Sequence, residues 1–220
     1  MFLAASWSFN MSHCTKFEFS YVNEEAIAKA FGKMGLSPTT GLVSVFASDF
    51  SKKVLSKIGY LGKQQFRAVC GQTADKFNLF VCQIEEGAYK LLIERGTVST
   101  DDEAIMADLA LRFQKAYISV AIDETIKRID ASGIPARVKE TLQGFEVEFG
   151  PNYEYSIHVT FTGDEITEEV HGVKGDICTK LTEELESLLS SPTAELVTEW
   201  KPEYTVVHEE QTLQILSANF

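Results

Sequence analysis

Apolar and polar residues alternate along several short segments of the chain, and this two-residue period is typical of β-strands with one buried face. Glu85-Glu86-Gly87 and Gly163-Asp164 separate neighbouring segments and favour tight turns, which predicts antiparallel hairpins. The predicted strands are Thr15 to Val22, Leu42 to Phe46, Phe66 to Cys70, Phe77 to Ile84, Tyr89 to Glu94, Thr141 to Phe149, Tyr155 to Phe161 and Ile166 to His171.

Other segments carry the helical period, in which apolar residues recur three and four positions apart. Asn23 is a good N-cap for a helix that ends near Gly35, and Ser48 to Ile58 fits a short second helix. Thr100-Asp-Asp-Glu103 has the spacing of a capping box, and it predicts a long helix to about Ser132. The long helix should bury one stripe of side chains: Met106, Leu109, Phe113, Tyr117 and Val120, then Ile122, Ile126 and Ile129.

This order of elements predicts an α+β fold in which an antiparallel sheet packs against a long helix. Gly150-Pro151-Asn152 is the expected boundary between an α+β domain at 11–150 and a small β-β-α unit at 151–192. Two strands and a helix are too small to be stable alone, so the unit should pack on the preceding domain or on a partner. Residues 193–220 are expected to form an extended acidic arm, and 1–10 an extension or a mis-assigned start.

Charge is distributed unevenly along the 220 residues, whose net charge is −12. Residues 1–144 hold 16 acids and 17 bases, whereas residues 145–220 hold 16 acids and 3 bases. Such an acidic half would repel a phosphate backbone, so nucleic acid is not expected as a partner. No apolar run is long enough to span a membrane, and residues 1–10 lack the basic start of a secretory signal. We therefore expect a soluble intracellular protein.

Cys178 is the candidate catalytic residue, because Asp176 can cap the predicted helix and place the thiol in its first turn. There the helix dipole lowers a thiol pKa, and Lys174 is near enough to help. Cys178 also shares a face with Leu181 and Leu185, however, and a cysteine on an apolar face is usually a small core residue.

Gly172, Lys174 and Gly175 form the candidate anion-binding site, since a glycine-bearing turn before a helix can offer its backbone amides to an anion. The alternative is a tight strand-to-helix turn that needs glycine for its conformation. His158 and His171 are expected to face each other on the polar side of a hairpin, as exposed histidines. We expect no metal site and no cofactor, because the common metal, hydrolase, nucleotide and dinucleotide motifs do not occur. Glu183, Glu184 and Glu186 are predicted to form a solvated helix face.

Two resemblances follow from these motifs. Three segments resemble the hypothetical chloroplast reading frame thirty-five family, a domain of unknown function numbered twelve fifty-seven. They are Met-Ser-His-Cys-Thr-Lys-Phe from Met11, Gly59-Tyr-Leu-Gly62 and Arg112-Phe113. Two further segments resemble a second family, the domain of unknown function numbered twenty-nine ninety-seven. They are Gly172-Val-Lys-Gly-Asp-Ile-Cys178 and Pro202-Glu-Tyr204.

The resemblances imply a fusion of the two families. The first occurs in algal plastids, cyanobacteria and other bacteria, and in bacteria the two tend to be encoded close together. The resemblances also imply a location in the cytoplasm or plastid stroma, and an ATPase of the AAA+ class as a partner, because such an ATPase tends to be encoded nearby. We therefore expect a non-catalytic accessory or adaptor protein that binds a protein partner. The alternatives are a thiol-dependent or anion-binding enzyme centred on Cys178 and Lys174, and a structural subunit of a larger assembly.

The reactivity of Cys178 separates the first two of these hypotheses. A buried thiol should react with iodoacetamide at neutral pH more slowly than a free thiol, whereas an activated thiolate should react faster. Mass spectrometry of the alkylated peptide gives the rate, and we expect slow labelling in the folded chain. Rapid labelling would favour the enzyme.

Overall fold

The computed structural model describes residues 13–44, 49–59, 65–95, 102–131, 133–173 and 177–200, although only the backbone is described for 177–181 and Trp200. The predicted extension at 1–10, Thr100 of the capping box and Asp176 lie outside this part of the chain. The chain divides into two compact units. Unit 1 contains Met1–Phe19, Ile122–Glu186 and Ala194–Phe220, and unit 2 contains Ser20–Ala121 and Ser187–Thr193.

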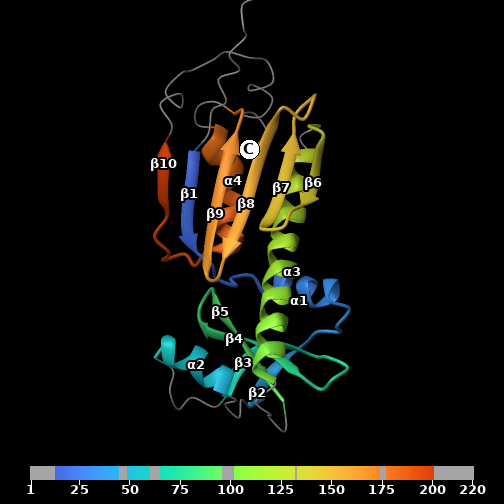
Figure 1. Ribbon diagram of the computed structural model, residues 1–220, viewed down its shortest axis with the longest axis vertical. Helices are drawn as coiled ribbons and strands as arrows, with labels where there is room; N and C mark the ends of the chain where they lie inside the picture. The colour runs from blue at the N-terminus through green and yellow to red at the C-terminus, as the bar shows by residue number, and fades with distance from the viewer. Residues whose placement is uncertain are drawn as a thin grey trace, which may run out of the picture. The chain divides into compact units, whose positions relative to one another are not determined.

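Unit 1 is built on a six-stranded sheet in the order β10-β1-β9-β8-β7-β6 (Figure 1). All neighbouring strands are antiparallel, which confirms the predicted α+β class for this part of the chain. The strands are β1 His13–Glu18, β6 Ala136–Glu140, β7 Gly144–Phe149, β8 Tyr155–Thr162, β9 Glu165–His171 and β10 Val197–Trp200.

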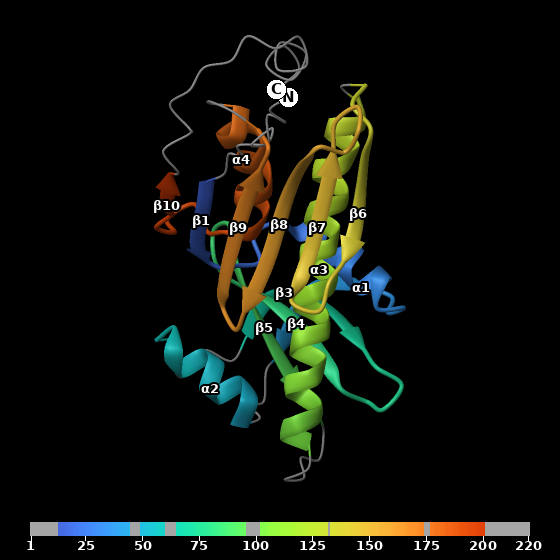
Figure 2. The ribbon, with the colours of Figure 1, turned by 45° about the horizontal axis from the view of Figure 1, so that its top comes forward.

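The strand period places one face of this sheet in the core. Phe145 and Val147 on β7 and Ile157 and Val159 on β8 are buried, as the alternation predicts. The helix α4 (Ile177–Leu189) and the last turns of α3 (Asp102–Ala131) lie along the same face in both views (Figures 1 and 2). The β-β-α unit therefore packs into a larger sheet, as its small size predicts.

The structure differs from the sequence prediction at several places in unit 1, and one of them is the unpredicted strand β6. The expected boundary at Gly150 is the connection between β7 and β8, which pair in one sheet. The segment from Thr141 is a turn and not the start of a strand, because the Thr141 hydroxyl accepts the Gly144 N–H at 3.0 Å and closes a hairpin between β6 and β7. The arm begins with a strand, since β10 pairs with β1; residues 201–220 lie outside the described part.

Unit 2 is built on a four-stranded antiparallel sheet in the order β2-β3-β4-β5. The helix α1 begins after Asn23, whose side chain accepts the Ala26 N–H at 2.9 Å, and this confirms the predicted N-cap. The elements are α1 Glu24–Lys33, β2 Thr39–Ser44, α2 Asp49–Lys57, β3 Gln65–Gln72, β4 Asn78–Glu85 and β5 Ala88–Glu94.

Helices cover both faces of the unit 2 sheet. On one face, Leu55 of α2 packs with Phe66 and Leu92 of the sheet. On the other face, the rings of Phe31 of α1 and Phe113 of α3 pack at a tilt of 55°, with centroids 4.6 Å apart. A Cβ on Gly71 of β3 would lie 2.8 Å from the Phe31 ring, so the sheet accepts α1 only because this residue lacks a side chain.

The buried Tyr117 of α3 joins three segments of unit 2. Its hydroxyl accepts the N–H groups of Val22 at 3.1 Å and Asn23 at 3.2 Å, and it donates to the Leu188 carbonyl at 2.9 Å. The ring packs edge-on against Tyr21, with centroids 5.0 Å apart. One side chain therefore satisfies three backbone groups that belong to no common helix or strand.

Replacement of Tyr117 by Phe should destabilise the chain by about 1–3 kcal/mol, because it leaves buried backbone groups without their partner while the ring remains. The free energy of unfolding in denaturant gives the effect. Tyr153→Phe is the control, since Tyr153 is exposed. Equal stabilities of the two variants would show that the hydroxyl is not needed.

Candidate functional site

The structure describes one of the four site residues that the sequence predicts. Lys174, Gly175 and the side chain of Cys178 lie outside the described residues, so the anion-binding and thiol hypotheses stay predictions. Gly172 has a φ of +84°, and a Cβ there would lie 2.7 Å from the Glu154 carbonyl oxygen. The conformation and the crowding both require glycine, which accounts for Gly172 without a ligand.

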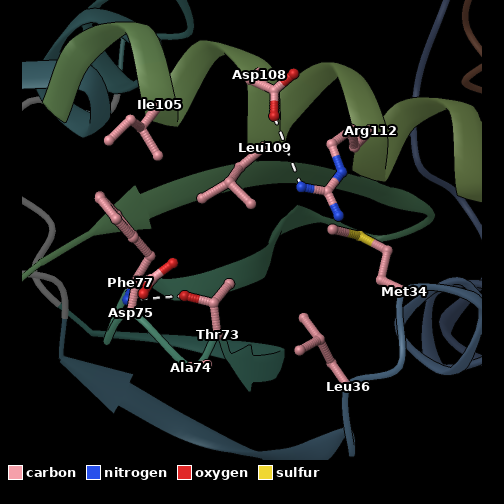
Figure 3. A pocket seen from close by; sticks show the side chains of 10 residues that line it. All are labelled: Met34, Leu36, Thr73, Ala74, Asp75, Phe77, Ile105, Asp108, Leu109 and Arg112. Atoms are coloured by element: carbon pink, nitrogen blue, oxygen red, sulfur yellow. Dashed lines mark hydrogen bonds and ion pairs between the residues drawn. The ribbon is translucent and has the colours of Figure 1, made fainter.

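A pocket of about 330 Å³ lies in unit 2 between α3, the end of α1 and the β3–β4 turn (Figure 3). Its size is at the lower end of the range for small-ligand sites. The apolar part of the lining is Met34, Leu36, Ala74, Phe77, Ile105 and Leu109, and the polar part is Thr73, Asp75, Asp108 and Arg112.

Helical spacing directs one face of α3 into this pocket. Ile105, Leu109 and Arg112 recur three to four positions apart, so they lie along one side of the helix. Leu109 is buried, whereas Ile105 keeps 45% of its surface exposed. Asp108 and Arg112 form an ion pair at 3.7 Å across the upper side of the view in Figure 3. The pocket thus has an apolar floor and a charged rim.

Sequence reasoning did not find this pocket. Its lining comes from three segments that are separated by dozens of residues, and none of them carries a recognisable motif. Arg112 was noted only as part of a family resemblance, and Leu109 only as part of the buried stripe. Only the packing of α3 beside the β3–β4 turn brings these side chains together.

Unit 1 holds a different kind of feature, a buried carboxyl group on the core face of its sheet. Glu168 of β9 is 0% exposed, and neither of its oxygens has a hydrogen-bond partner among the described residues. Burial raises the pKa of Glu168 well above its usual value near 4.5, and Glu186 adds to this rise by repulsion. The burial of Glu168 could have been predicted from the two-residue period of the strand, because Ile166, Glu168 and Val170 must lie on the same face.

Glu186 of α4 approaches the same region, and the prediction that it belongs to a solvated helix face is wrong. Its carboxyl group accepts hydrogen bonds from Thr182 and Thr15, and burial raises its pKa. Thr15 lies directly opposite Glu168 in the β1–β9 register, so the two acids are neighbours in the core. The helical period alone does not show that Glu186 is partly buried. A residue at the border between the buried and exposed faces of a helix is covered or left exposed according to which neighbouring element packs there.

The prediction for the other two glutamates of that run is partly confirmed. Glu183 is exposed, as expected for a solvated face. Glu184 instead forms an ion pair with Arg128 of α3, at 2.7 Å, and its side chain is 29% exposed. Like Glu186, it is held by a neighbouring element of unit 1.

His13 of β1 is a further titratable group on the core face. It is 1% exposed, and burial lowers its pKa to about 4. His13 and Glu168 therefore both favour their uncharged forms when the chain is folded. The interior of unit 1 holds an acid and a base, each shifted towards neutrality by loss of water.

The opposite face of this sheet carries the two histidines of the predicted pair. The rings of His158 and His171 lie with centroids 4.8 Å apart, which confirms their cross-strand contact. His158 is 3.3 Å from Glu146, and His171 is 3.5 Å from Glu169. Among the described residues, no group of three or more His, Cys, Asp and Glu side chains is placed to hold a metal ion. The histidines thus belong to a half-exposed network of charged strand residues.

Comparison with known proteins identifies one part of the chain. A family model described as "Protein of unknown function (DUF2997)" matches residues 157–205, which include most of β8 and all of β9, α4 and β10. No curated protein matches the chain. No solved structure matches it either. In the described part of the chain, no helix is both long and apolar enough to cross a membrane.

Replacement of Glu168 by Gln should stabilise the chain increasingly as pH rises. Folding raises the pKa of this carboxyl group above its value in the unfolded chain, which is near 4.5. The protonated group therefore stabilises the fold fully at pH values below 4.5. This stabilisation is lost as the pH rises through the higher pKa of the folded chain. Glutamine resembles the protonated acid and does not ionise. We expect similar stabilities near pH 4, and a higher free energy of unfolding for Glu168→Gln than for the wild type at pH 8, because only the wild type then contains a buried group that would ionise freely in the unfolded chain.

Denaturant unfolding of both chains between pH 4 and pH 8 tests this expectation. Glu165→Gln is the matched control, since Glu165 is exposed on the same strand. Parallel pH profiles for wild type and Glu168→Gln would contradict the effect of burial on Glu168.

Proposed function

We propose that the chain is a non-catalytic accessory or adaptor protein that binds a protein partner through the pocket of unit 2. The observation that supports this function is the pairing of an apolar floor with a charged rim on an accessible helix face. Protein interfaces concentrate their binding energy in such places, where an apolar side chain of the partner fills a pocket and polar groups surround it.

The composition of the pocket is also consistent with a binding role. Its ten lining residues include no cysteine and no histidine, and their one hydroxyl group belongs to Thr73. Nucleophilic catalysis needs a nucleophile beside a base, and this lining does not supply that pair. Two acids and one base line the rim, which favours a partner that presents an apolar side chain next to a basic one.

For the partner we propose an ATPase of the AAA+ class, on the strength of the two family resemblances. The acidic excess of residues 145–220, which lie outside the pocket lining, suits a partner that also carries a basic surface. An acidic protein attracts such a partner over a range of about 8–10 Å at physiological salt. The pocket would then fix the orientation of the complex.

Replacement of Ile105 by Asp should abolish capture of the partner, because it places a charge on the apolar wall of the pocket. Wild-type and variant chains are used as baits in a lysate of the source organism, and captured proteins are identified by mass spectrometry. We expect an AAA+ ATPase on the wild-type bait and its loss on Ile105→Asp. Calorimetry with the purified ATPase should show binding weakened at least tenfold.

Leu111→Asp is the matched control for this experiment. Leu111 lies on the same helix, is 52% exposed, and does not line the pocket. Its variant should capture the ATPase as well as the wild type does. Equal capture by all three chains would exclude the pocket as the site, and the absence of an ATPase from every bait would contradict the proposed partner.

A further inference from the structure

The four polar side chains that line the pocket of unit 2 have different roles. The Thr73 hydroxyl accepts the Phe77 N–H at 3.1 Å, so it shapes the β3–β4 turn. Asp108 and Arg112 lie one turn apart on α3 and pair with each other at 3.7 Å. The exposed carboxylate of Asp75 forms no ion pair or hydrogen bond with another residue in the described part of the chain. Asp75 is therefore the lining acid whose charge this part of the chain leaves without a base.

Asp75 borders the apolar part of the pocket (Figure 3). Asp75, Phe77 and Ile105 lie on one side of this view, whereas Arg112 and Met34 lie on the other. Phe77 is buried, but Ile105 is still partly in contact with water. A negative charge thus stands beside an apolar surface that is not yet covered.

The β3–β4 turn fixes the backbone that carries Asp75. The Lys76 N–H donates to the Thr73 carbonyl at 3.0 Å, and at the base of the turn the Gln72 side chain donates to the Asn78 side chain at 2.7 Å. Lys76 adopts a φ of +68°, which is unfavourable for a residue with a side chain and persists only where neighbouring contacts impose it. A carboxylate on such a turn loses little backbone freedom when it binds an opposite charge.

We infer that Asp75 receives a lysine or arginine side chain of the protein partner, next to an apolar side chain of the partner that fills the pocket. This role rests on the proposed function, in which the pocket binds that partner. The apolar contact shields the ion pair from water in part, which strengthens it relative to a fully exposed pair. A basic side chain also brings an apolar stem, which can cover Ile105.

The charge of the rim favours a basic group over an acidic one. An acidic group could bind Arg112 only by replacing Asp108, and it would then share the pocket with two carboxylates. A basic group meets Asp75 without breaking any of the ion pairs described in the pocket. Lys76, the nearest base in sequence, does not line the pocket. Asp75 is thus placed to select the partner by its charge.

Selection from a random library of short peptides displayed on phage tests this role, with the purified full chain as bait. Peptides that bind the pocket are those enriched on the wild type and lost on Ile105→Asp. We expect them to carry Lys or Arg beside an apolar residue, and we expect Asp75→Arg to select an acidic residue there instead. Glu86→Arg is the matched control and should select the same peptides as the wild type, since Glu86 is exposed in the β4–β5 turn and does not line the pocket.

The affinity of a selected synthetic peptide, measured by fluorescence anisotropy, separates charge recognition from a structural role of Asp75. Binding to Asp75→Asn should be weakened about fivefold, as is typical of an ion pair at a partly exposed rim. Rising salt should weaken binding to the wild type more than binding to Asp75→Asn, because salt screens the ion pair. The same peptide with Glu in place of its basic residue should bind Asp75→Arg more tightly than it binds the wild type.

The possible failures of Asp75 and of the pocket give different results. Pocket-dependent peptides without a basic residue would overturn the role of Asp75 and leave the proposed function standing. Equal affinity and equal salt dependence of the wild type and Asp75→Asn would do the same. If no enriched peptide depends on Ile105, the pocket is not a peptide site, and the proposed function is contradicted together with the role of Asp75.

Discussion

The hydroxyl group of Tyr117 is the constraint on which unit 2 depends, because it satisfies backbone groups that secondary structure leaves without partners. The N–H groups of Val22 and Asn23 precede α1, and the Leu188 carbonyl is near the end of α4. A buried backbone group without a hydrogen bond costs free energy, so these segments can leave water together only around such a side chain. The tilted ring pair of Phe31 and Phe113, together with the missing side chain at Gly71, then sets how closely α1 approaches the sheet.

Unit 1 is organised around the distribution of its acids. The excess of acidic residues after position 144 is partly offset by bases from earlier in the chain. Arg137 and Lys139 of β6 pair with Glu148 of β7, and they hold the pKa of that carboxyl group below its usual value. Arg128 pairs with Glu184 in the same way. Among the described residues Glu168 has no hydrogen-bond partner, and burial shifts it towards its neutral form instead.

The pocket of unit 2 is the surface to which we assign binding of a partner. It offers side chains of defined shape and charge, which select a partner by its sequence.

The sequence by itself determined the features that depend on neighbouring residues. The alternation of β7 and β8, the buried stripe of α3 and the Asn23 cap all follow from a local period or a local backbone conformation. Tertiary structure alone decided that β1 lies between β9 and β10, that Glu186 turns inward, and that three distant segments enclose a pocket. The physical reason is that an amphipathic strand or helix specifies which face is buried, but not which of several similar faces it packs against.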